Sequence, residues 1–132
     1  MLEMAFYLPW IFFFFIGAVD WGFFAYALVS VENAARVAAM YTSAGSSTAA
    51  DSSGACAVVL GELRTLPNIG TRITSCGGSN PVSVTATQVT GPDSAAASQV
   101  SVTYTSVNLV PIPGILAKGF TWTRSVTVRL RS

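Results

Sequence analysis

A long apolar run in the first third of the chain limits what the sequence can fold into. From Met4 to Val31 there is no Lys or Arg, and the only acidic residue is Asp20. A helix that crosses a bilayer needs about 20 apolar residues, and the stretch Leu8 to Val31 has that length. A signal peptide carries basic residues before its apolar run, whereas this chain carries the acidic Glu3 there. We therefore interpret the run as a membrane-spanning helix.

The rest of the sequence has the composition of a small polar domain. Hydrophobic residues make up 52% of the 132 residues and charged residues only 10%, well below the roughly 25% of an average soluble domain. This deficit lies in the apolar run. The net charge is +1 and the basic residues are scattered, so the sequence indicates no nucleic-acid partner.

The two acids of the N-terminal segment, Glu3 and Asp20, have no basic residue of the same segment to pair with. A carboxylate at mid-membrane costs roughly 2.5–3.5 kcal/mol and usually faces a protein partner. We therefore expect partners from another chain or from a free N-terminal amine. The alternative is that Asp20 is protonated or reaches water near an interface. Pro9 predicts a kink or a short unwound stretch, unless it is accommodated in the first turns of the helix.

The helix is expected to continue beyond the apolar run. Glu32 and Arg36 have the i,i+4 spacing with the acid first, which favours a helix. Apolar side chains recur there at spacings of three and four, at Ala34, Val37, Met40 and Tyr41. The predicted helix runs from about Leu2 to about Ser43, or about 60 Å at 1.5 Å per residue. It is roughly twice as long as a bilayer is thick, so its outer half is suited to packing against protein.

The segments "LEMAFYLPWIFFFFIG" and "VENAARVAAMY" resemble the TadE-like branch of the type IV pilin superfamily. The resemblance implies a precursor that is cleaved by a prepilin peptidase. Pilus-assembly machinery would then move it from the inner membrane into a helical filament of identical subunits on the bacterial surface. Glu3 matches the family's acid that neutralises the N-terminal amine of a neighbouring subunit, although it lies closer to the start of the chain than in pilins. No leader ending in Gly or Ala precedes it, so we expect a mature or trimmed sequence.

The filament interpretation also assigns roles to other residues of the helix. Asp20 and Arg36 are candidates for charge contacts between subunits, whereas an intrahelical pair with Glu32 is the alternative for Arg36. The aromatic side chains are expected to pack against one another in the filament core, namely Phe12, Phe13, Phe14, Phe15, Trp21, Phe23 and Phe24.

The C-terminal part is expected to form a small α+β domain of residues 44–132 behind the long helix of residues 1–43. After a linker over residues 42–55, "ACAVVLGELRTLP" predicts a short helix, with Ser53 as its candidate cap. A short strand is expected at residues 71–76. Alternating apolar and hydroxyl residues predict three further strands, in "VSVTATQVT", "SQVSVTYTSVNLV" and "GFTWTRSVTVRLRS". The fold class is thus α+β, with three or four antiparallel strands.

Two further features of this domain leave alternatives open. Cys56 and Cys76 are expected to form a disulfide in an oxidising compartment, and the alternative is two free buried thiols. The apolar segment "LVPIPGILAKG" either contacts a neighbouring subunit or covers the domain's own helix or sheet. The side chains concerned are Val110, Ile112, Ile115 and Leu116.

The sequence gives no indication of an enzyme, a metal site or a cofactor. It contains no His, the commonest general base and metal ligand, and its Ser and Thr residues therefore have no such base to activate them. The primary hypothesis is a structural pilin subunit of an extracellular filament. The alternative is a minor pilin or pseudopilin-like component that stays anchored in the inner membrane. No feature supports a third class, a membrane-tethered adhesive module.

Overall fold

The computed structural model describes residues 2–107 and 119–131, with side chains from Phe6 onward. Its elements follow in the order α1 (Leu2–Thr42), α2 (Ser52–Glu62), the short 3-10 helix η1 (Leu63–Thr65), β1 (Val82–Thr90), β2 (Ala96–Thr105) and β3 (Thr121–Arg129). The long helix, the short helix and three antiparallel strands confirm the predicted α+β class.

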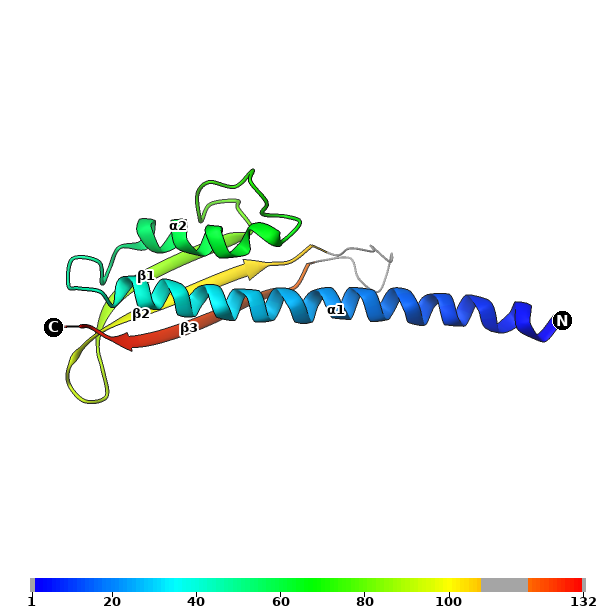
Figure 1. Ribbon diagram of the computed structural model, residues 1–132, viewed down its shortest axis with the longest axis horizontal. Helices are drawn as coiled ribbons and strands as arrows, with labels where there is room; N and C mark the ends of the chain where they lie inside the picture. Colours follow the sequence, from blue (N-terminus) through cyan, green and yellow to red (C-terminus); the bar gives the residue numbers. More distant parts are fainter. Residues whose placement is uncertain (1, 108–118, 132) are drawn as a thin grey trace.

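Helix α1 is one uninterrupted helix of 41 residues, about 60 Å long. Its N-terminal half extends away from the rest of the molecule, while its C-terminal half lies along the sheet and α2 (Figure 1). The helix continues through Pro9, so the unwound stretch expected there is absent from residues 2–42. A proline this close to the start of a helix removes a single backbone hydrogen bond, and the turns that follow keep theirs.

The sheet has the strand order β1-β2-β3 with antiparallel pairing throughout. Its register pairs Val84 with Val102 and Val100 with Val126, which places these apolar residues on one face. Helix α1 covers that face over β2 and β3, and α2 covers it over β1. The opposite face carries hydroxyl side chains that form hydrogen bonds between β2 and β3. The oxygen–oxygen distance is 2.7 Å both for Ser101 and Ser125 and for Thr103 and Thr123.

The core is built where the C-terminal half of α1 meets α2 and the sheet. Five alanines of α1 are fully buried there, Ala27, Ala34, Ala35, Ala38 and Ala39, and they belong to the same cluster as Val59, Val100 and Val102. Small side chains allow the helix backbone to approach its neighbours closely, and close packing is what gives a protein interior its density. The core therefore continues across residue 43, and the division into domains 1–43 and 44–132 stays a prediction.

The cap of α2 is Asp51, and the prediction of Ser53 was wrong. Asp51 Oδ1 accepts hydrogen bonds from the backbone N–H groups of Ser53, at 3.1 Å, and Gly54, at 2.9 Å. Ser53 lies within the first turn, where its own N–H needs the cap. The Tyr41 hydroxyl donates to Asp51 Oδ2 at 2.9 Å and thereby joins the end of α1 to the start of α2. A Cβ at Gly54 would overlap both side chains.

The strand expected at residues 71–76 is not formed; the prediction was wrong. This segment follows Gly70 and precedes Gly77 and Gly78, all three with positive φ angles of 51°, 85° and 64°, which turn the backbone away from an extended path. The Cys56–Cys76 disulfide is formed as predicted and ties the segment to α2. The predicted apolar surface at Val110, Ile112, Ile115 and Leu116 lies outside the described residues.

Candidate assembly surface

The N-terminal half of α1 carries a large unburied apolar surface. The exposed fractions of its big apolar side chains range from 59% to 74% for Phe6, Tyr7, Leu8, Trp10, Ile11, Phe12, Phe13, Phe14 and Phe15. Trp21 is 78% exposed, whereas Phe23 and Phe24 are partly buried. By length and composition, the helix from Phe6 to Thr42 is able to cross a membrane.

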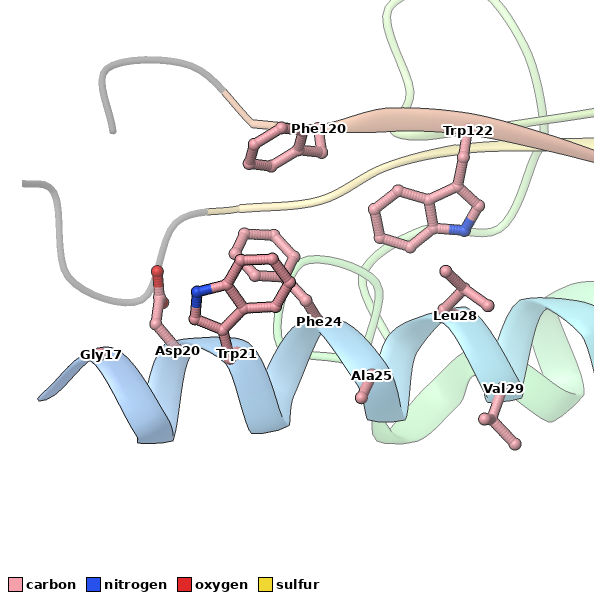
Figure 2. Close-up of a pocket in the computed structure, with 9 residues that line it drawn as sticks. All are labelled: Gly17, Asp20, Trp21, Phe24, Ala25, Leu28, Val29, Phe120 and Trp122. Carbon is pink, nitrogen blue, oxygen red and sulfur yellow. The ribbon is translucent and has the colours of Figure 1, made fainter. Parts of the chain in front are cut away.

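An apolar groove of about 600 Å³ lies where α1 begins to contact the sheet. One wall consists of α1 residues and the other of two aromatic side chains from the start of β3, Phe120 and Trp122 (Figure 2). Phe24 meets Phe120 edge to face, with 5.2 Å between the ring centroids, and Trp122 points towards Leu28. Together with Gly17, Asp20, Trp21, Ala25 and Val29 these residues line the groove, which we call the apolar groove.

Asp20 is the one acidic residue that lines the apolar groove. Its side chain is 3% exposed, and neither carboxylate oxygen has a hydrogen-bond partner among the residues that the structure describes. The Nε1 atom of Trp122, on the other wall, is also buried without a described partner. Burying a carboxylate without a partner is costly unless it is protonated or meets a cation. The groove therefore presents a side chain that requires a proton or a donor from elsewhere.

The two other predicted charge residues lie apart from this groove. Arg36 Nη2 contacts Glu32 Oε1 at 2.6 Å, and both side chains are exposed, by 62% and 42%. The structure thus forms the intrahelical pair that the i,i+4 spacing allows. Glu3 lies in the first turns of α1. Within the single chain, Asp20 and Arg36 are separated by more than four helical turns, and the structure does not bring them together.

No group of three or more His, Cys, Asp or Glu residues that could hold a metal ion occurs in the described part of the chain. The two shifted pKa values outside α1 belong to structural contacts. Hydrogen bonds from Gly54, Ser53 and Tyr41 lower the pKa of Asp51, and burial raises the pKa of Tyr104 to about 12.

The segment that carries the exposed apolar surface of α1 matches a known protein family. The family model described as TadE-like protein matches residues 1–40. The match confirms the resemblance predicted from the same segment, and it ends within α1. No curated protein and no solved structure matches the chain. Together with the apolar helix, the match fits a pilin-like protein associated with a Tad pilus and anchored in a membrane.

Sequence reasoning identified the α1 wall of the apolar groove and missed the wall on β3. The alternating pattern around Phe120 and Trp122 predicted a strand but not what that strand contacts. Asp20 was recognised only as an acidic residue within an apolar run. Pairing these two segments depends on where β3 lies in the sheet, and the sequence carries no local signal for that.

Proposed function

We propose that this protein is a structural pilin subunit that polymerises through α1 into an extracellular Tad-type filament. The observation that carries the proposal is the exposed aromatic surface of α1 between Phe6 and Phe15. Such a surface is stabilised by about 25 cal/mol for every Å² that leaves water. Before assembly, lipid of the inner membrane covers it, and after assembly the equivalent helices of other subunits do.

The length of α1 supports the same proposal. A single crossing of the hydrocarbon core requires about 20 residues, whereas α1 has 41. Its C-terminal half is held by the protein's own core, so the free half alone has the length of one membrane crossing. Extraction of that half from lipid leaves the folded domain unchanged, because the domain makes none of its core contacts with it.

Asp20 supplies the contact that gives assembly a fixed register in this proposal. Its carboxylate is buried in the apolar groove without a described partner, and a cation from a neighbouring subunit would compensate the cost of burying it. The candidates are an N-terminal amine and Arg36 of another subunit. Arg36 remains available because its exposed pair with Glu32 is of the kind that contributes little to stability.

Glu3 has a separate role in the proposal, the neutralisation of a neighbour's N-terminal amine as subunits are added. The residue lies in the segment that the family model matches, which is the support for this assignment. A prepilin peptidase and pilus-assembly machinery are the partners that such a precursor requires.

A second candidate function is a minor pilin or pseudopilin-like component that remains in the inner membrane. The observation in its favour is that a helix long and apolar enough to span a bilayer already accounts for the exposed aromatic surface without any filament. The two candidates differ in where the chain is found. Fibres sheared from cells contain it in the first case, and only detergent extracts of the inner membrane contain it in the second.

The decisive experiment combines electron microscopy of the sheared material with a Glu3→Ala variant. We expect fewer fibres from this variant while the C-terminal part stays folded. Glu62→Ala is the matched control, because that acid lies on α2 and its one hydrogen bond within the described residues comes from the Asn33 side chain, at 3.3 Å. Normal fibre yield from Glu3→Ala would remove Glu3 from its role, and a chain found solely in the inner membrane would establish the second candidate.

An Asp20→Asn variant in the same assay tests the register contact. Asn has nearly the same shape as Asp and does not ionise, so it preserves the packing and removes the ion pair. Reduced fibre yield supports a cation from a neighbouring subunit. Unchanged yield would show that assembly does not depend on an ion pair at Asp20.

A further inference from the structure

The structure points to a second interaction surface, the outer edge of β3, which we propose accepts an extended acidic segment of another polypeptide by β-strand addition. This edge lies away from the apolar groove's α1 wall and from the N-terminal half of α1. The proposal does not require a filament, although Arg36 lines the groove beside this edge and is also considered above for a contact between subunits.

The backbone of β3 is open along its whole outer side. The bonds from Ser106 N–H to the Phe120 carbonyl, at 2.8 Å, and from Leu130 N–H to the Ala96 carbonyl, at 3.0 Å, show that even-numbered residues bond to β2. In an antiparallel pair the bonding direction alternates along the strand. The N–H and C=O groups of five residues therefore point outward, those of Thr121, Thr123, Ser125, Thr127 and Arg129.

These five residues have no backbone hydrogen bond on that side within the described ranges. Figure 1 shows β3 as the margin of the sheet, with no described helix or strand beyond it. The other edge of the sheet is different. On β1 the Ser52 hydroxyl contacts both the N–H of Ala86, at 2.9 Å, and its carbonyl, and Gly77 N–H donates to the Val82 carbonyl. The β1 edge is thus partly closed by the protein itself.

A polar groove of about 530 Å³ runs beside the open edge, between α1 and β3. It is lined by Glu32, Arg36, Arg124, Ser125, Val126 and Thr127. A strand added to β3 would place every second side chain over this groove, because side chains alternate between the two faces of a sheet. Those side chains would meet Arg124, which has no ion pair among the described residues. They would also lie near the pair of Arg36 and Glu32, so Arg124 is the cation that leaves the groove with an excess positive charge.

The charges of the edge define the kind of partner. Arg124 and Arg129 lie on β3 and Arg131 follows it, and of these only Arg129 has a described acidic partner, Asp93 at 3.3 Å. An antiparallel pair of two β3 strands would place Arg124 of both copies on the same face of the joined sheet, where like charges close to one another across strands are destabilising. An extended segment with carboxylates over the polar groove would pair both with the open backbone and with Arg124, in the mode known as β-augmentation.

The test uses the full chain in detergent micelles and a synthetic fluorescent peptide as long as β3. The peptide alternates Thr with Val and carries Glu at the positions that face the polar groove; a matched peptide carries Lys there. We expect the Glu peptide to bind at least about tenfold more tightly than the Lys peptide by fluorescence anisotropy. The amide protons of Thr123, Ser125 and Thr127 become protected from exchange when it binds.

Two pairs of variants assign the binding to the edge and to its charge. Ser125→Pro removes one outward N–H, at a strand position where proline is tolerated, and should weaken Glu-peptide binding about tenfold or more. Ser125→Ala keeps the N–H and should bind as the wild type does, with circular dichroism confirming the fold of both. Arg124→Gln should lower the affinity for the Glu peptide, whereas Arg129→Gln, on the opposite face of the sheet, should have a smaller effect.

Three results would overturn the proposal. Binding that survives Ser125→Pro would place the peptide elsewhere, and equal affinity for the two peptides would exclude the charge preference. Failure of both peptides to bind would also overturn it. An edge that then stays empty would show that the arginines keep it apart from other strands, whereas concentration-dependent dimers would show that a second copy of the chain occupies it.

Discussion

The two halves of α1 share one backbone and have opposite surroundings. Between Phe6 and Phe15 the large side chains are 59–74% exposed, whereas Ala34, Ala35, Ala38 and Ala39 are fully buried. Side-chain size is thus divided along the helix: small residues lie where the protein packs against itself, and large aromatic residues lie where it has no contacts of its own. The difference teaches that the contacts within the subunit require close approach of the helix, and that the bulk of its apolar area is left for other molecules.

The largest expected effect comes from the Cys56–Cys76 disulfide. It holds residues 71–76 beside α2, and α2 packs against the buried half of α1. The Cys56→Ser, Cys76→Ser double variant removes a crosslink between residues 20 apart in sequence. The loop-entropy relation gives a loss of about 3 kcal/mol in the free energy of unfolding, measured by chemical denaturation in detergent. Amide exchange should accelerate in residues 27–42 and stay unchanged in residues 6–19. An unchanged unfolding midpoint would show that the crosslink does not support the fold.

A middle-sized effect separates the two halves directly. Ala35→Leu inserts bulk into the packed face of α1, and overpacking of this kind costs roughly 1–3 kcal/mol. Phe13→Ala is its counterpart in the free half: it should leave the unfolding free energy of the domain unchanged and reduce fibre yield. Equal destabilisation by the two substitutions would mean that the free half also contributes to the domain's stability.

The smallest effect concerns Tyr104, which packs against Trp122, a residue of the apolar groove that lies at the border between the two halves of α1. Its ring packs against that of Trp122 at 5.4 Å, and its hydroxyl donates to Asn68 Oδ1 at 2.6 Å. Burial raises the pKa of Tyr104 from 10.0 to about 12. The resulting stabilisation is complete below pH 10 and is lost as the pH rises towards 12, because the unfolded chain releases this proton first.

The matching variant is Tyr104→Phe. It should cost about 1 kcal/mol at neutral pH through the lost hydrogen bond and should flatten the decline of stability between pH 10 and pH 12, as followed by denaturant titrations. Tyr7→Phe in the exposed half is the control, with no change expected in either quantity. A decline that persists in Tyr104→Phe would assign the alkaline sensitivity to another group.

The sequence predicted the elements whose periodicity is strong and failed where tertiary contacts decide. The span of α1 and the three strands followed from apolar spacing, and the Cys56–Cys76 disulfide from cysteine number and context. The cap of α2 was assigned to Ser53, which lies just before the apolar residues that predicted the helix, whereas the helix begins earlier, at Ser52, and is capped by Asp51. The strand expected at residues 71–76 was prevented by the glycine turns on either side.

For the same reason, only the part of the candidate site that lies on α1 could be predicted from the sequence. The helical wall of the apolar groove lies within one continuous segment, so Asp20 and Trp21 were recognised in the sequence. Trp122 joins them across about a hundred residues of chain, through a strand position that depends on the whole sheet. The open edge of β3 likewise became visible only when the strand order was known.

The end of β3 has a practical consequence. The Arg131 N–H donates to the carbonyl of Ser43 at 2.9 Å, so the chain passes beside the C-terminal end of α1, at the extremity of the molecule opposite to its N-terminus (Figure 1). A fluorophore or affinity tag joined after this point would be displayed far from the aromatic helix. Such a label would allow living cells to be imaged while the surface proposed for polymerisation stays untouched.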